Sequence, residues 1–451
     1  MEMASKDWSR HEPHMPCAVA FPASTEQVAA VVRVCAAARI PIVPRGAGTG
    51  VEGGAIPYGG AVVLSTARLR HMELLEEEML AVVGAGIYKN ELNDFLAPKG
   101  LLFGPDPSSN PTVGGMASTG GSGMSTLRYG TTKENVVSLL VVTPQGNIIR
   151  TRRRVRKSSS GYELTQLYLG SEGTLGVICE VTVRVRQQPP LRSGGLLPFP
   201  DVHSAVCAVV DAVRADPPTL LRCELLNADG VRCTNAMFKT ELECAPTLFV
   251  ELRGGDADAL RRDFDVVAAL AGRHGCRPEK TRFAAAGDEL DALWEARRGC
   301  YFAAMKYRGN PGGDRVFVGD ICVPVSRLAE CVSEVEADCE RSGFRCVICA
   351  HIADGNFHCL VPYQPHEEEA IEAFESRMIE RGLSVGGTVT GEHGVGVGKV
   401  RHCCAEHGAE HIALQQAVKR ALDPQGIMNP GKVLPIAPVP STSTPESKAR
   451  L

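Results

Sequence analysis

The feature that most restricts the fold is a glycine-rich loop at residues 44–54, which lies between two predicted strands. Small residues at this density let backbone N–H groups converge on an anion such as a pyrophosphate. A Rossmann nucleotide site would require an amphipathic helix to begin directly after the glycines. More glycine, Pro57 and a second strand follow instead. The pattern therefore predicts an anion-binding loop and argues against a Rossmann NAD site.

Two further glycine-rich segments follow at 114–123 and 170–176, and Asp106-Pro107 precedes the first of them. Glycine allows backbone conformations that wrap closely around a ligand. Three such segments in one part of the chain indicate a single site that they share. A chance set of surface turns is the alternative interpretation of each loop taken alone.

Hydrophobic periodicity predicts an α+β arrangement up to about residue 188, where Pro189-Pro190 indicates a boundary. Ser24 and Gln27 form a predicted capping box for a helix that runs to about Arg39. Predicted strands of this first part cover 40–43, 61–64, 139–143 and 177–185. Longer helices alternate with single strands afterwards, and the predicted segments are helices 204–215, 257–275 and 327–342 and strand 247–253.

A candidate metal hairpin surrounds Asp354-Gly355, a dipeptide that favours a two-residue turn between apolar strands. With these two residues as the turn, His351 would lie directly opposite His358 on one face of the sheet. Opposed residues have Cβ atoms ~4.5–5.5 Å apart, so that two imidazoles could hold one divalent metal. Glu392, in the loop Thr390–Gly396, is a candidate third ligand. Two isolated histidines and a solvated turn are the alternatives.

The three glycine segments, in this order and at these separations, resemble the FAD domain of the vanillyl-alcohol-oxidase type. From Pro13 to Leu434 the chain resembles the FAD-linked D-lactate and D-2-hydroxyacid dehydrogenases, particularly the D-lactate dehydrogenase branch. The resemblance implies an α+β fold with a vanillyl-alcohol-oxidase (PCMH-type) FAD-binding domain and an α+β substrate domain with an antiparallel sheet. Expected units are an FAD domain at 13–190, a substrate and metal domain at 191–425, a return segment at 426–436 and a disordered tail at 437–451.

The resemblance also implies the residues that hold FAD. Relatives that bind flavin covalently carry a histidine where Thr49 stands here, so non-covalent FAD is expected. The implied FAD-binding residues are Arg45, Gly46, Ala47, Gly48, Thr49, Gly50, Gly53, Pro105, Asp106, Gly114, Gly115, Ala117, Gly121, Ser122, Tyr129, Glu172, Gly173, Gly176, Ile178 and Asn429.

The implied reaction is oxidation of a small D-2-hydroxy acid, such as D-lactate, to the 2-keto acid without NAD. His351, His358 and Glu392 match the family's metal ligands, a set that suits both zinc and manganese. His393 matches its general base, and Arg297 its carboxylate-binding arginine, with Lys399 as a second candidate. Glycolate and D-2-hydroxyglutarate remain alternative substrates. A non-redox alkyl-dihydroxyacetone-phosphate synthase and a non-catalytic flavin scaffold are the rival functions.

The composition of the chain restricts which binding partners and which cell compartments are expected. A formal net charge of −4 gives no reason to expect nucleic acid, and no apolar run approaches a transmembrane length. The 17 cysteines are scattered, as in reduced intracellular proteins, and Cys346 and Cys349 are interpreted as packed thiols. The basic run 152–157 is interpreted as a solvated loop, with a nuclear signal or a docking patch as alternatives.

The C-terminus supplies the one targeting signal. The chain ends Ala449-Arg450-Leu451, which fits a peroxisomal address read by an import receptor. A peroxisomal location is therefore expected, with a mitochondrial one as the alternative, although the early acidic residues and short leader weaken the latter. An unidentified electron acceptor completes the expected partners.

Overall fold

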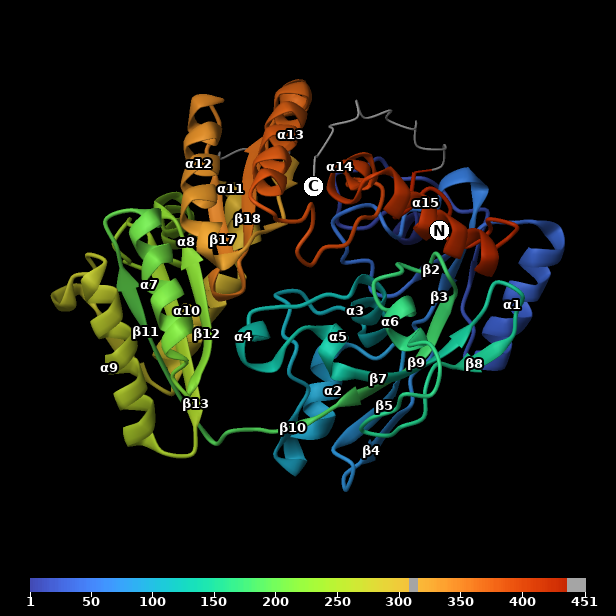
Figure 1. The fold of residues 1–451 in the computed structure, drawn as a ribbon, viewed down its shortest axis with the longest axis horizontal. Helices are drawn as coiled ribbons and strands as arrows, with labels where there is room; N and C mark the ends of the chain where they lie inside the picture. Colours follow the sequence, from blue (N-terminus) through green and yellow to red (C-terminus); the bar gives the residue numbers. More distant parts are fainter. Residues whose placement is uncertain (308–314, 436–451) are drawn as a thin grey trace, which may run out of the picture.

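The structure is a computed structural model that describes residues 1–307 and 315–435. Two α+β parts lie side by side, and the chain passes between them after the short strand β10 (Arg186–Gln187) (Figure 1). The C-terminal tripeptide and the predicted tail at 437–451 lie outside the described residues. Among the described helices, none is long and apolar enough to cross a membrane.

The N-terminal part contains a parallel sheet of order β1-β3-β2 and an antiparallel sheet of order β4-β5-β9-β7-β8. Their strands are β1 (Ala18–Ala20), β2 (Ile42–Arg45), β3 (Val62–Ser65), β4 (Met72–Leu75), β5 (Leu80–Gly84), β7 (Val136–Val142), β8 (Ile148–Arg150) and β9 (Val177–Arg184), and β6 (Leu101–Leu102) pairs with β10. The helices are α1 (Thr25–Ala38), α2 (Lys89–Leu96), α3 (Val113–Thr119), α4 (Thr126–Tyr129), α5 (Thr132–Asn135) and α6 (Leu164–Tyr168).

The first predicted helix is confirmed, and it begins where the sequence indicates. The backbone N–H of Gln27 donates to Ser24 Oγ at 3.3 Å, so Ser24 caps α1. The following strand was predicted to end at Pro44, but β2 runs through it to Arg45. Proline is tolerated there because β2 is an edge strand of its sheet.

The C-terminal part is built on an eight-stranded sheet of order β14-β11-β13-β12-β17-β18-β15, with β16 beside β18. Its strands are β11 (Leu191–Pro198), β12 (Leu220–Leu226), β13 (Thr247–Gly254), β14 (Arg282–Ala285), β15 (Arg315–Val318), β16 (Ile321–Cys322), β17 (Val347–His351) and β18 (Asn356–Tyr363), and every pairing is antiparallel. The helices are α7 (Val202–Ala215), α8 (Ala228–Phe238), α9 (Ala257–Arg273), α10 (Asp288–Arg298), α11 (Cys300–Lys306), α12 (Leu328–Arg341) and α13 (Glu368–Ser384). The predicted helices 204–215, 257–275 and 327–342 and strand 247–253 are confirmed within a few residues.

Residues of this sheet alternate between two hydrophobic clusters, as the period of two in a strand requires. Ile348 and Ala350 of β17 pack with α7, α9, α12 and α13, whereas Val347 and Cys349 pack with α8, α10 and α11. Cys346 belongs to the first cluster and Cys349 to the second. The two thiols therefore lie in different packing layers, which supports their interpretation as packed side chains.

The end of the chain returns to the N-terminal part. Helices α14 (Cys403–His407) and α15 (Ala409–Leu422), red in Figure 1, lie against that half. After α15, Ile42 of β2 donates to the Ile427 carbonyl at 2.7 Å and accepts from the Asn429 N–H at 2.8 Å. The last described segment is thus attached by backbone hydrogen bonds beside the first glycine-rich loop.

Candidate functional site

A cavity of about 530 Å³ lies between the glycine-rich loops and one face of the eight-stranded sheet. Both parts of the chain contribute to its walls, and most of the predicted site residues reach it. The predicted residues that line it are Arg45, Gly46, Ala47, Gly48, Thr49, Gly50, Gly114, Gly115, Gly121, Ser122, Glu172, Gly173, Gly176, Ile178, Arg297, His351, His358, Glu392 and His393. The sequence motifs for nucleotide binding and for metal binding therefore meet in one space.

The first glycine-rich loop has the properties of an anion-binding loop. Gly48 has φ +73°, in the left-handed region, and a Cβ there would collide with the Arg45 guanidinium. Arg45 Nη1 is buried and has no hydrogen-bond partner among the described residues. A buried donor without a partner is costly, and an anionic group such as a pyrophosphate would satisfy it. The residues present therefore fit the phosphate end of FAD.

Seven predicted residues do not line the cavity: Gly53, Pro105, Asp106, Ala117, Tyr129, Lys399 and Asn429. Asp106 instead joins the two parts of the chain, because it forms ion pairs with Lys89 at 2.9 Å, Arg222 at 3.0 Å and Arg298 at 2.9 Å. Tyr129 packs against Gly104, and the guanidinium of Arg186 lies over its ring.

Asn429 and Lys399 lie behind the cavity wall. Asn429 Nδ2 donates to the carbonyls of Gly54 at 3.0 Å and Glu172 at 2.7 Å, so it connects two of the ligand loops. Lys399 is fully buried, its Nζ is 3.9 Å from Glu52 Oε1, and it has no hydrogen-bond partner within residues 1–307 and 315–435. Neither side chain lines the cavity.

The hairpin that carries His351 and His358 differs from the predicted one. His351 pairs with Asn356 and His358 with Cys349, so the two histidines are not directly opposed. A 3-10 turn at Ile352–Asp354 precedes Gly355, whose φ of +81° is left-handed, and the connection is longer than two residues. The predicted two-residue turn is therefore wrong. Because the register differs by two residues, the side chains remain on one face.

Three donor groups converge at this hairpin. Glu392 Oε1 lies 3.1 Å from His351 Nε2 and 3.2 Å from His358 Nε2. The ligand atoms of His351, His358 and Glu392 all lie within 4.8 Å of one another, as in a group that can hold a metal ion. Two imidazoles and one carboxylate are a donor set that leaves coordination positions open. The residues present fit a divalent metal.

The charges of these groups are strongly coupled. Burial opposes protonation of His351, but Glu224 and Glu392 outweigh it and hold its pKa well above the ordinary value. Burial favours the neutral acid of Glu392, but His351 and His358 outweigh it and hold its pKa well below the ordinary value. A metal ligand imidazole must be neutral, so metal binding would displace protons from this cluster.

His393 differs from its neighbours in its charge. Its ring stacks on that of His358, with centroids 4.8 Å apart and an interplanar angle of 16°. Burial lowers the pKa of His393 below its ordinary value, although Asp320 acts in the opposite direction. The imidazole is therefore neutral near pH 7 and can accept a proton.

Glu224 of β12 is a residue of the candidate site that sequence reasoning missed. It forms an ion pair with Arg297, and His351 Nδ1 lies 2.9 Å from its Oε1. Arg297 and Glu224 are each 1% exposed. A carboxylate on Nδ1 fixes a histidine so that Nε2 faces a metal. The available signal was an acidic residue inside the apolar strand Leu220–Leu226, which requires a buried partner.

Comparisons with known proteins identify the family of the chain. The model of the FAD binding domain matches residues 16–152, and the model of the C-terminal domain of FAD linked oxidases matches residues 188–433. The chain belongs to the FAD-linked oxidase family. It is therefore an FAD-binding oxidoreductase, and the cavity is its candidate active site.

Within this family, the chain is similar to D-lactate dehydrogenases and to a glycolate oxidase subunit. The chain is 36% identical over 442 residues to a probable mitochondrial D-lactate dehydrogenase of Danio rerio, covering 96% of this chain and 87% of that protein. It is 37% identical to a mitochondrial D-lactate dehydrogenase (cytochrome) of Arabidopsis thaliana, covering 94% and 74%. It is 31% identical to the glycolate oxidase subunit GlcD of Bacillus subtilis, covering 93% and 89%.

Solved structures confirm the predicted vanillyl-alcohol-oxidase type of fold. p-Cresol methylhydroxylase superposes with a TM-score of 0.75 at 18% identity, covering 95% of this chain and 91% of that one. Alkyldihydroxyacetonephosphate synthase superposes with a TM-score of 0.69 at 20% identity, covering 91% and 75%. These likenesses concern the fold alone.

Proposed function

We propose that the protein is a metal-assisted, FAD-dependent dehydrogenase that oxidises D-lactate or a similar small D-2-hydroxy acid to the 2-keto acid. The observation that carries this proposal is the convergence of His351, His358, Glu392, His393 and Arg297 on the cavity that the FAD loops line. The relatives named as D-lactate dehydrogenases support the choice of substrate.

Arg297 binds the substrate carboxylate in this proposal. It lines the cavity, and its Nε has no hydrogen-bond partner in the described part of the chain. A planar guanidinium matches the geometry of a carboxylate. Glu224 pairs with Nη2 of the same guanidinium, so the arginine is held in place before the substrate arrives.

His393 takes the proton of the substrate hydroxyl at a ring nitrogen as general base. Its neutral state near pH 7 suits that role. The candidate metal, zinc or manganese, would be held by His351, His358 and Glu392 and would supply a Lewis acid that lowers the pKa of the hydroxyl. FAD, non-covalently bound because Thr49 stands in the first loop, would supply the hydride acceptor.

Anaerobic addition of D-lactate to the purified yellow protein is expected to bleach the flavin absorbance near ~450 nm, because hydride transfer reduces the cofactor. A chelator should abolish the bleaching, and restored metal should recover it. L-lactate is the stereochemical control and should leave the absorbance unchanged. Glycolate and D-2-hydroxyglutarate, tested in parallel, decide among the small hydroxy acids.

Absence of bleaching with every D-2-hydroxy acid would exclude this function. The non-redox synthase would then be the stronger candidate, because that enzyme shares the fold. It would be tested by alkyl exchange without net reduction of the flavin.

We also propose a peroxisomal location on the basis of Ala449-Arg450-Leu451. A fluorescent protein that ends in residues 437–451 should become punctate and coincide with a peroxisomal marker. The same fusion without Leu451 should stay diffuse. A diffuse signal from the complete tail would contradict the proposal and favour the mitochondrial alternative, which is the location in the names of the D-lactate dehydrogenase relatives.

A further inference from the structure

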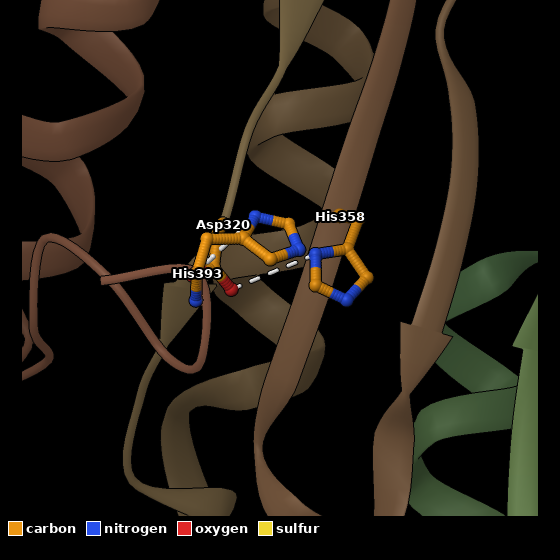
Figure 2. A group of neighbouring side chains, drawn as sticks. All are labelled: Asp320, His358 and His393. Atoms are coloured by element: carbon orange, nitrogen blue, oxygen red, sulfur yellow. Dashed lines mark hydrogen bonds and ion pairs between the residues drawn. The ribbon is translucent and has the colours of Figure 1, made fainter. Parts of the chain in front are cut away.

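Asp320 occupies a central position in the candidate site, although no sequence motif pointed to it. It lies between β15 and β16 and is fully buried. Figure 2 shows its carboxylate beside the stacked imidazoles of His358 and His393. A buried carboxylate requires several donors to remain ionised, and this one has them.

The carboxylate holds the loop that carries Glu392 and His393. Asp320 Oδ2 accepts hydrogen bonds from Thr390 Oγ1 at 2.8 Å and from the backbone N–H groups of residues 391, 392 and 393 at 2.9, 2.9 and 3.0 Å. Asn356 Nδ2 donates to Oδ1 at 2.8 Å. One side chain thus fixes the backbone of two functional residues.

The same carboxylate also faces both imidazoles. His358 Nδ1 lies 3.5 Å from Oδ1, and His393 Nδ1 lies 3.7 Å from Oδ2. Neither Nδ1 has a hydrogen-bond partner among the described residues. A neutral imidazole carries its proton on one nitrogen only, so an Nδ1–H directed at Asp320 leaves Nε2 with a free lone pair.

We propose that Asp320 is a positioning residue that acts on both histidines. It directs Nε2 of His358 toward the other two metal ligands, His351 and Glu392, and it leaves Nε2 of His393 free to accept the substrate proton. This inference rests on the proposed function. The geometry has one rival, because Asp320, His358 and His393 also place ligand atoms within 4.8 Å of one another. The two arrangements differ in the number of metal ions bound per chain, which can be measured.

The variant Asp320→Asn tests the proposal, because it keeps the volume but removes the charge that faces both Nδ1 atoms. At saturating metal, the rate constant for anaerobic flavin reduction should fall about 10–100-fold, and metal affinity measured against a competing chelator should fall by a similar factor. The apparent Kd for D-lactate should change less than about threefold, since Arg297 is untouched. Asp338→Asn is the matched control, because Asp338 is a buried carboxylate on α12, paired with Arg377 at 3.0 Å.

A measurement on the unaltered protein keeps the proposal testable if Asp320→Asn does not fold. The measurement is the ¹⁵N NMR spectrum of metal-loaded holoenzyme with ¹⁵N-labelled histidine. The signals of His393 are those that disappear in His393→Gln, and they should be those of the Nδ1–H tautomer. The Nε2–H tautomer, two metal ions per chain, or unchanged kinetics and metal affinity in Asp320→Asn would each overturn the proposal. Because the tautomer and the metal measurements need no substrate, they decide this inference even if no D-2-hydroxy acid reduces the wild type.

Discussion

Replacement of His393 by alanine is expected to lower the rate constant for flavin reduction by D-lactate about 10²–10⁴-fold, the usual contribution of a general base. The reason is that His393 is the neutral imidazole of the cluster, whereas His351 and His358 are held by Glu392. Stopped-flow absorbance under anaerobic conditions measures the rate constant. FAD content should remain that of the wild type, since His393 lies outside the glycine-rich loops.

His402→Ala is the matched control for this substitution. His402 is half-buried and close in the sequence, but it does not line the cavity, and it should retain the wild-type rate within about threefold. A reduction rate above one tenth of wild type in His393→Ala would show that another group accepts the proton. Loss of the yellow colour in this variant would assign a structural role to the residue instead.

Most of the architecture could be predicted because it depends on local signals. The cap at Ser24 and the density of glycine act within a few residues of their effects. The face shared by His351 and His358 was predicted for the same reason, since a register that differs by two residues preserves it. The turn itself could not be predicted, because Asp354-Gly355 also fits the end of a 3-10 turn followed by a left-handed glycine.

The supporting carboxylates could not be found in the same way. Glu224 lies 127 residues before His351, and Asp320 lies 73 residues before His393. Their roles depend on how β12 and the segment after β15 pack beside the hairpin, which is tertiary information. Glu224 lies inside a buried strand and Asp320 between two strands, and such a position predicts a buried partner without identifying it.

Glu224→Gln is expected to lower the free energy of unfolding by about 3–5 kcal/mol, the cost of leaving a buried partner charge uncompensated. The charge left behind belongs to Arg297, which is 1% exposed and pairs with Glu224. Metal affinity should also fall about 10–100-fold, because His351 Nδ1 loses its carboxylate. Urea unfolding and chelator competition measure the two effects separately.

The double variant Glu224→Gln/Arg297→Met distinguishes pairing from simple damage to the core. Removal of both charges leaves no uncompensated guanidinium, so most of the lost stability should return. Flavin reduction should not recover, because the substrate carboxylate has lost its arginine and His351 its partner. If the double variant is as unstable as Glu224→Gln, the loss of stability arises from packing around β12. Arg297, Glu224 and His351 would then affect metal binding and substrate binding but not the stability of the fold.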